Sequence, residues 1–155
     1  MVRMTRSCHA CRTDQFCRRL IFIFACCVSI GCSSGSPYKY IKASGKLTYE
    51  DGSPLPSRGV RLQFDSQDAP AVANAHPRPA VANVNDKGEF DCVTSYKYGD
   101  GLIRGKHKVA IEQATDQKGQ LLVPREYTSI ASTPLIVDTD NLPLEIKVPK
   151  PKRDR

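Results

Sequence analysis

The fold class follows from the stretch Val84-Asn85-Asp86-Lys87-Gly88-Glu89-Phe90 and its continuation Tyr98-Gly99-Asp100-Gly101-Leu102-Ile103-Arg104-Gly105-Lys106-His107-Lys108-Val109-Ala110-Ile111. Asp86-Lys87-Gly88 separates runs that alternate apolar and polar residues. This pattern predicts a hairpin, because glycine can take the positive φ that closes a tight turn. Gly99, Gly101 and Gly105 would let the backbone cross from one sheet to another. His107, Val109 and Ile111 would then share one face of a strand, which indicates a β-sandwich.

Similar alternation predicts strands on both sides of this stretch. Ala43, Gly45, Leu47 and Tyr49 form one apolar face, and Gly45 indicates a bulge or a close backbone approach. Val60, Leu62 and Phe64 form another. Residues 80–84 should pair through the turn with residues 89–93. Residues 134–137 and 142–148 should form the last pair, joined by the turn at 138–141. We therefore expect an all-β chain: a single antiparallel β-sandwich of about seven strands over residues 38–149, with very little helix.

Residues 65–83 interrupt this pattern. Pro70-Ala71-Val72-Ala73-Asn74 recurs as Pro79-Ala80-Val81-Ala82-Asn83, and three prolines argue against a central strand before Ala80. A five-residue repeat is too short for a structural array. We favour a loop that grew by local duplication, with a binding loop as the alternative.

The N-terminus has the pattern of an export signal. Arg18-Arg19 precedes a run of 11 apolar or small residues, 20–30, which suits a signal peptide and is short for a membrane span. Ser29-Ile30-Gly31-Cys32 resembles a bacterial lipobox, in which the cysteine becomes lipidated, and 32–37 would be a flexible tether. The alternatives are a secretory signal cleaved without lipidation, or an uncleaved anchor.

Charge and cysteine content agree with a division of the chain into an N-terminal signal segment and a folded domain. Residues 1–31 hold five Arg and one Asp, which leaves residues 32–155 with 18 basic and 15 acidic groups and argues against a nucleic-acid binder. Six of the seven cysteines lie at or before position 32, so the domain must fold without disulfides. Cys8-His9-Ala10-Cys11 resembles a metal or redox motif, but it lacks a second pair and lies in the segment we expect to be removed.

A family resemblance covers residues 38–149. Several segments resemble, in the same order, parts of small transthyretin-like, carboxypeptidase-regulatory-like domains: Ala43–Tyr49 with Gly52-Ser53-Pro54-Leu55, Asp86–Phe90, Asp100-Gly101 with Gly105–Val109, and Val123–Tyr127 with Ser132–Leu135. Such domains occur in short lipoproteins of planctomycete bacteria. The resemblance implies an envelope-facing β-sandwich without known catalytic residues. His107 departs from it, because that position usually holds an aromatic residue.

No pattern in the chain indicates a reaction centre, a cofactor or a metal, so we predict no catalytic, cofactor-binding or metal-ligating residue. His107 should be packed or hydrogen-bonded, and Cys92 should be a small core residue. Asp86, Glu89, Asp91 and Asp100 match no calcium loop, and turn chemistry explains Asp86 and Asp100. The basic tail 150–155 is expected to be a solvated terminus, the alternative being contact with anionic lipid or wall polymers.

These observations favour a non-catalytic cell-envelope lipoprotein that is anchored through Cys32 and faces the periplasm or the exterior. Its sandwich would make structural or recognition contacts with an envelope protein or a cell-wall polysaccharide. The alternative is a carbohydrate- or small-ligand-binding module that serves an envelope enzyme or transporter. Such a module needs an exposed aromatic surface, for which Tyr38, Tyr40, Tyr96 and Tyr98 are the candidates. An enzyme is the third class and the least favoured.

Overall fold

The structure is a computed structural model that describes residues 36–56, 59–72 and 76–152. The predicted signal segment 1–31, Cys32, the tether to residue 35, part of the first repeat copy and residues 153–155 lie outside the described residues. Within the described part, no helix is long and apolar enough to cross a membrane.

The described chain is all-β, as predicted. It has ten strands and one short 3-10 helix, η1 (Arg125–Thr128). The strands are β1 (Tyr40–Ile41), β2 (Gly45–Tyr49), β3 (Arg61–Ser66), β4 (Ala80–Asn83), β5 (Glu89–Phe90), β6 (Val93–Thr94), β7 (Leu102–Ile103), β8 (Lys106–Glu112), β9 (Ile136–Asp138) and β10 (Leu144–Val148).

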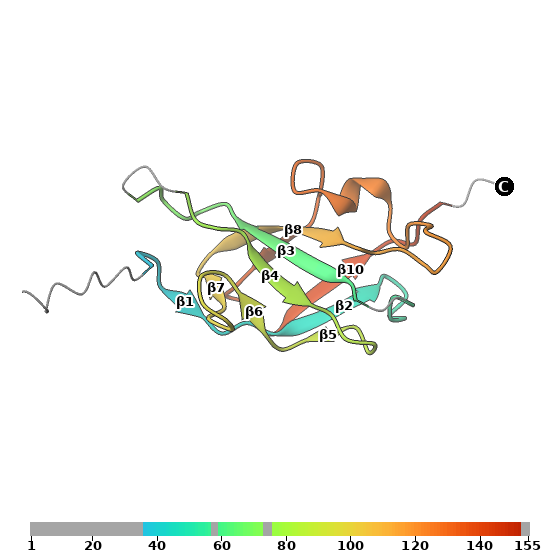
Figure 1. Ribbon diagram of the computed structural model, residues 1–155, viewed down its shortest axis with the longest axis horizontal. Helices are drawn as coiled ribbons and strands as arrows, with labels where there is room; N and C mark the ends of the chain where they lie inside the picture. The colour runs from blue at the N-terminus through green and yellow to red at the C-terminus, as the bar shows by residue number, and fades with distance from the viewer. Residues whose placement is uncertain (1–35, 57–58, 73–75, 153–155) are drawn as a thin grey trace, which may run out of the picture. The chain divides into compact units, whose positions relative to one another are not determined.

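The strands form two main sheets and a small ribbon. One sheet has the order β10-β2-β5, the other has the order β6-β4-β3-β8-β9, and β1 pairs with β7. Figure 1 shows β3, β4 and β8 lying over β2 and β10. The rings of Phe64 on β3 and Phe90 on β5 meet between the sheets, with centroids 6.0 Å apart. The two sheets therefore enclose one aliphatic core with few aromatic rings.

Alternation in the sequence predicts the core residues well. Leu62 and Phe64 are buried on β3, as are Val109 and Ile111 on β8, the strand that pairs with β3 over six residues. The last strand also keeps its period of two, since Leu144, Ile146 and Val148 are all buried. Burying such side chains contributes about 1.5–3 kcal/mol each, so these strands supply much of the stability.

The predicted turn at Asp86-Lys87-Gly88 forms, but the strands on either side of it do not stay together. Gly88 has a φ of +79°, and its amide donates to the Asn85 carbonyl. The Asn85 side chain supports the turn, because its Oδ1 accepts the amides of Lys87 and Glu89. After the turn, β5 joins β2 and only β6 returns to β4. The predicted pairing of residues 80–84 with 89–93 is thus confirmed at Ala82 and Val93, but it is wrong for Glu89 and Phe90, which pair with β2.

The predicted closing hairpin is also wrong. β9 pairs with β8 in the larger sheet, whereas β10 crosses to the smaller sheet and runs parallel to β2. The turn at residues 138–141 is bonded to Gly105, just before β8: the Gly105 amide donates to Thr139 Oγ1, and the Thr139 amide donates to the Gly105 carbonyl. This anchorage directs the chain from one sheet to the other.

Gly45 confirms the predicted close backbone approach. A Cβ at this position would lie 2.2 Å from the Leu144 carbonyl oxygen and 2.8 Å from the Phe90 ring. Real Cβ atoms do not approach other heavy atoms so closely, so only glycine lets β10 lie this near to β2.

Candidate functional site

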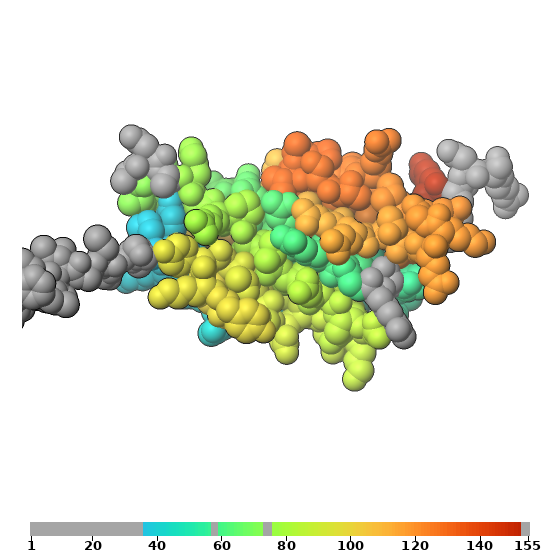
Figure 2. Space-filling model, in the orientation of Figure 1, coloured from blue at the N-terminus to red at the C-terminus, as the bar shows by residue number. Residues whose placement is uncertain are grey.

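The tyrosines predicted as a ligand surface lie on segments that meet at one end of the sandwich. Tyr40 is on β1, and β1 pairs with β7, which follows the corner loop 95–101 that carries Tyr96 and Tyr98. Lys42, just after β1, donates a hydrogen bond to the Gly99 carbonyl of this loop. Figure 2 shows these N-terminal and corner segments, blue and yellow, beside one another on the left.

The corner loop is held by one carboxylate. Asp100 Oδ1 accepts the amide of Ser95 at 2.7 Å, and Oδ2 accepts the amides of Tyr96 and Lys97 at 2.9 and 2.8 Å. Burial by itself would raise the pKa of Asp100, but these backbone donors outweigh it and lower the pKa below its usual range. The turn chemistry predicted for Asp100 is confirmed, and the loop has a defined shape.

Two of the tyrosines project from this ordered loop. Tyr98 is 90% exposed, and a hydrogen bond with the Cys92 side chain beside it raises the pKa of the phenol. Tyr96 is 36% exposed, and the Arg78 guanidinium lies over its ring, 5.7 Å from the centroid. The loop therefore presents one fully accessible ring next to one that a cation already covers.

The other two tyrosines have more internal roles. The Tyr38 hydroxyl donates to the Pro70 carbonyl at 3.0 Å, and the Tyr40 hydroxyl bonds the Ser36 hydroxyl at 2.6 Å. Both side chains are half-buried. Their hydroxyls hold the N-terminal residues of the described chain in place, and Tyr98 is the most accessible ring of the four.

His107 is buried, as predicted, with only 2% of its surface exposed. Its Nε2 bonds the Ile103 carbonyl at 2.7 Å, its ring meets Phe64 edge-on, and its Nδ1 is buried without a hydrogen-bond partner. Burial lowers the pKa of His107, against the opposing effects of the Ile103 carbonyl and of Asp65, Asp68 and Asp138. Such a ring is a neutral packing element that a substrate cannot reach.

Cys92 and the acidic residues do not form a site. Cys92 is half-buried beside Gly99 and lies outside the core cluster, so the prediction that it is a core residue is wrong. The chain at Asp91 and Cys92 belongs to neither neighbouring strand, and this break removes Cys92 from the face of Phe90. Within the described ranges, no three His, Cys, Asp or Glu side chains are placed to hold a metal ion.

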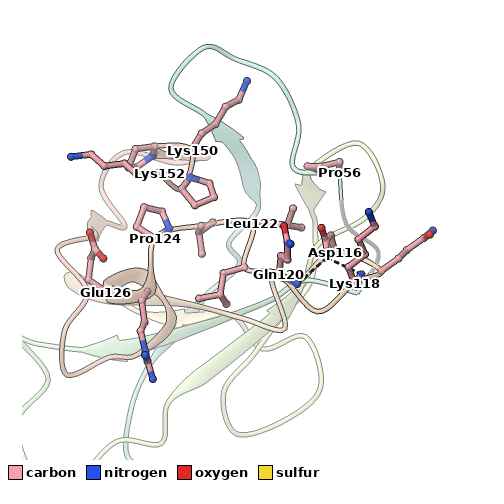
Figure 3. Close-up of a pocket in the computed structure, with 15 residues that line it drawn as sticks. Pro56, Asp116, Lys118, Gln120, Leu122, Pro124, Glu126, Lys150 and Lys152 are labelled. Carbon is pink, nitrogen blue, oxygen red and sulfur yellow. Dashed lines mark hydrogen bonds between the residues drawn. The ribbon is translucent and has the colours of Figure 1, made fainter. Parts of the chain in front are cut away.

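A second surface, which the sequence did not predict, lies where β2 and β10 end. It is an open groove of about 1320 Å³ between three segments: the turn after β8, the chain from Leu121 to Glu126, and the chain after β10. Figure 3 shows Leu122 and Pro124 along its floor, Lys150 and Lys152 on one side, and Asp116 and Lys118 on the other. We call this the lysine–proline groove, and define it by Pro56, residues 116–118, residues 120–126 and residues 149–152.

One wall of the groove involves the predicted solvated tail. Lys150 binds Asp51 at 2.5 Å and lies over the Tyr49 ring, 5.2 Å from its centroid. This hydrogen bond, followed by those from Ser53, holds the pKa of Asp51 far below its usual range. The tail therefore contacts the sandwich at Lys150, although this side chain remains 58% exposed.

The floor and the opposite wall are also held by hydrogen bonds. The buried Tyr49 hydroxyl donates to the Leu122 carbonyl at 2.9 Å. Asp116 Oδ1 accepts the amides of Lys118 and Gln120, and Thr115 bridges to Leu121 across the turn. Because these hydrogen bonds already hold the groove in shape, a ligand would not have to pay the cost of forming it.

Sequence reasoning missed this groove because its walls are separated by up to about a hundred residues along the chain. The only signal was the concentration of Pro and Lys in residues 149–152, which a disordered tail would share. In comparisons with known proteins, no family model, no curated protein and no solved structure matches this chain.

Proposed function

We propose that this protein is a non-catalytic lipoprotein of the cell envelope, anchored through Cys32, whose sandwich recognises another envelope component. The anchor is inferred from the basic residues, the short apolar run and the Gly31-Cys32 junction. A transthyretin-like sandwich is the kind of domain that the resemblance associates with such an anchor. The proposal assigns no reaction to the chain: the imidazole of His107 is enclosed in the core, where it cannot act on a bound molecule.

The observation that carries the recognition role is the Asp100-ordered corner loop with its exposed Tyr98. An accessible aromatic ring on an ordered loop provides a large contact area at a small entropic cost, and Tyr is enriched at interfaces for this reason. The same exposed ring would serve the alternative function, a carbohydrate-binding module, because sugars stack on aromatic faces.

The position of the loop limits what it can reach. The described chain begins at Ser36, whose hydroxyl bonds Tyr40 at the same end of the sandwich. Three residues lie between Cys32 and Ser36, so the four residue steps place a lipidated Cys32 at most ~15 Å from Ser36. We therefore expect the partner of Tyr98 to be an envelope component close to the membrane.

Site-specific photo-crosslinking in the producing cells tests this proposal. A benzoyl-phenylalanine at position 98 keeps an aromatic ring on the loop, and the same group at position 87 provides a control on the distant exposed turn. We expect one defined adduct from position 98 and none from position 87. Equal labelling from both positions, or no adduct from position 98, would contradict the recognition role.

The anchor has a separate test. Cys32→Ser should move the protein from the detergent phase to the aqueous phase in a phase-partition experiment, and should remove the acyl mass from the N-terminal peptide. An unchanged partition, or an N-terminal peptide that begins before Cys32, would refute the lipoprotein assignment.

A further inference from the structure

We propose that the lysine–proline groove binds an extended acidic peptide whose acidic side chains alternate with apolar ones. The groove lies at the ends of β2 and β10 and shares no residue with the corner loop, so this binding would be additional to the recognition proposed above.

Charge is the first argument. Lys118, Arg125 and Lys152 line the groove, and none of them takes part in the ion pairs found among the described residues. Asp116 and Glu126 also line the groove, so these three cations exceed the carboxylates by one charge, while Lys150 is paired with Asp51. Complementary charge therefore favours an anionic ligand.

The apolar floor is the second argument. Leu121 is 40% exposed in the groove, and Pro124, Pro149 and Pro151 add rigid apolar surface around it. A ligand that carried only negative charge would leave this surface in water. A ligand with apolar groups between its charges would bury it, at about 25 cal/mol for each Å² removed from water.

Size and position favour a peptide over a small molecule or a membrane. The volume of about 1320 Å³ exceeds the usual range for small-molecule pockets, and the groove is open. Its concave shape suits a chain rather than a flat lipid surface. The groove and Ser36 also lie at opposite ends of β2, whose five residues span ~16 Å.

The groove is formed before any ligand arrives. The Lys150–Asp51 pair fixes one wall, Tyr49 fixes the floor, and the Asp116 turn fixes the other wall. The prolines at 149 and 151 hold the wall extended, which favours an extended ligand alongside it. Binding would thus order the peptide alone and would cost little in the protein.

Fluorescence anisotropy on the full-length chain in neutral dodecyl maltoside micelles tests the proposal. The probe is a fluorescein-labelled peptide of three Glu-Leu-Glu-Pro repeats, and the comparison peptide has Ser in place of Leu. We expect saturable binding that weakens with salt, and at least several-fold weaker binding of the Ser peptide. Equal affinity for the two peptides, or no binding of the Leu peptide, would overturn the proposal.

Variants locate the binding. Lys118→Glu combined with Lys152→Glu should weaken binding about tenfold or more, since each exchange replaces an attraction with a repulsion. Leu121→Ser should weaken it several-fold. Lys87→Glu combined with Lys106→Glu makes the same change in net charge at exposed positions outside the groove and the corner loop, and should leave the affinity unchanged.

Two further results would refute this assignment. One is an equal loss in both charge-reversal pairs, which would mean that net charge alone drives the association. The other is binding to phosphatidylglycerol vesicles that the groove variants abolish, in the absence of peptide binding, because the groove would then contact a membrane. Both charge-reversal pairs alter exposed side chains, so matching thermal melts should show that they fold.

Discussion

Replacing Gly45 by alanine tests the parallel pairing of β10 with β2, which is the least expected feature of the fold. The new Cβ would lie 2.2 Å from the Leu144 carbonyl oxygen and 2.8 Å from the Phe90 ring. The neighbours must recede by roughly 1 Å to reach an ordinary van der Waals distance. The oxygen belongs to the backbone of a paired strand, so a side-chain rotation cannot relieve the clash.

The expected cost comes from two opposing contributions. Overpacking a well-filled site typically costs about 1–3 kcal/mol, and we expect the upper part of this range because the obstacle is backbone. Alanine is favoured over glycine in a strand by about 0.5–1 kcal/mol, which offsets part of it. If β10 detached, the burial of Leu144, Ile146 and Val148 would be lost, at about 1.5–3 kcal/mol each. Taking about 2–3 kcal/mol for the overpacking less the offset of about 0.5–1 kcal/mol, we expect Gly45→Ala to destabilise the protein by about 1–2.5 kcal/mol while β10 stays paired.

Chemical denaturation and amide hydrogen exchange measure this effect. The free energy of unfolding should fall by the stated amount and the melting temperature by roughly 10 °C. Exchange should accelerate first at the Leu144 amide, which donates to the Ser44 carbonyl. Ser44→Ala is the matched control, because Ser44 is the exposed neighbour and keeps the same backbone contact. A loss below about 0.5 kcal/mol in Gly45→Ala, the level of an ordinary surface change, would refute the β10–β2 register.

Three further predictions concern single side chains. Because burial lowers the pKa of His107 below 6.5, its contribution to stability is present above pH 6.5 and is lost as the pH falls below it, while the unfolded chain takes up a proton. The free energy of unfolding, measured down to about pH 5, should therefore depend more steeply on pH in the parent than in His107→Phe. His76→Gln, a control at an exposed site, should match the parent. Equal slopes in all three proteins would contradict this prediction. Tyr49→Phe leaves the buried Leu122 carbonyl without its donor and should cost about 1–2 kcal/mol in urea unfolding. Asp100→Ala removes the acceptor of three amides and should cost about 2 kcal/mol and lower the photo-crosslinking yield from position 98, whereas Asp91→Ala, at an exposed neighbour, should change neither. An unchanged crosslinking yield in Asp100→Ala would show that the loop does not need this carboxylate.

The sequence predicts whatever depends on neighbouring residues. The alternation of Leu62 with Phe64 and of Val109 with Ile111 identifies the core faces, because side chains on a strand point to opposite sides in turn. Gly45 and Gly88 likewise mark a close approach and a turn through the properties of glycine itself. Such features need no knowledge of which strand lies alongside.

Pairing partners could not be predicted in the same way. Residues 142–148 have the same period of two whether they return along β9 or run parallel to β2, so alternation does not distinguish these arrangements. What distinguishes them is the bond between Thr139 and Gly105, residues far apart in sequence that give no sign of each other. The groove was missed for the same reason, because Tyr49, Leu122 and Lys150 come together only after β2 and β10 are paired.

The two candidate surfaces depend on different parts of the fold. The corner loop is held by Asp100, a residue of the loop itself, so its shape depends mainly on local bonds. The groove instead depends on β2, which places Tyr49 under Leu122 and under Lys150. β10 delivers Lys150 to this position only if it stays in register with β2, and that register requires the absence of a side chain at Gly45. A change in the sheet should therefore alter the groove before it alters the corner loop, since the bonds that define the loop do not pass through β10.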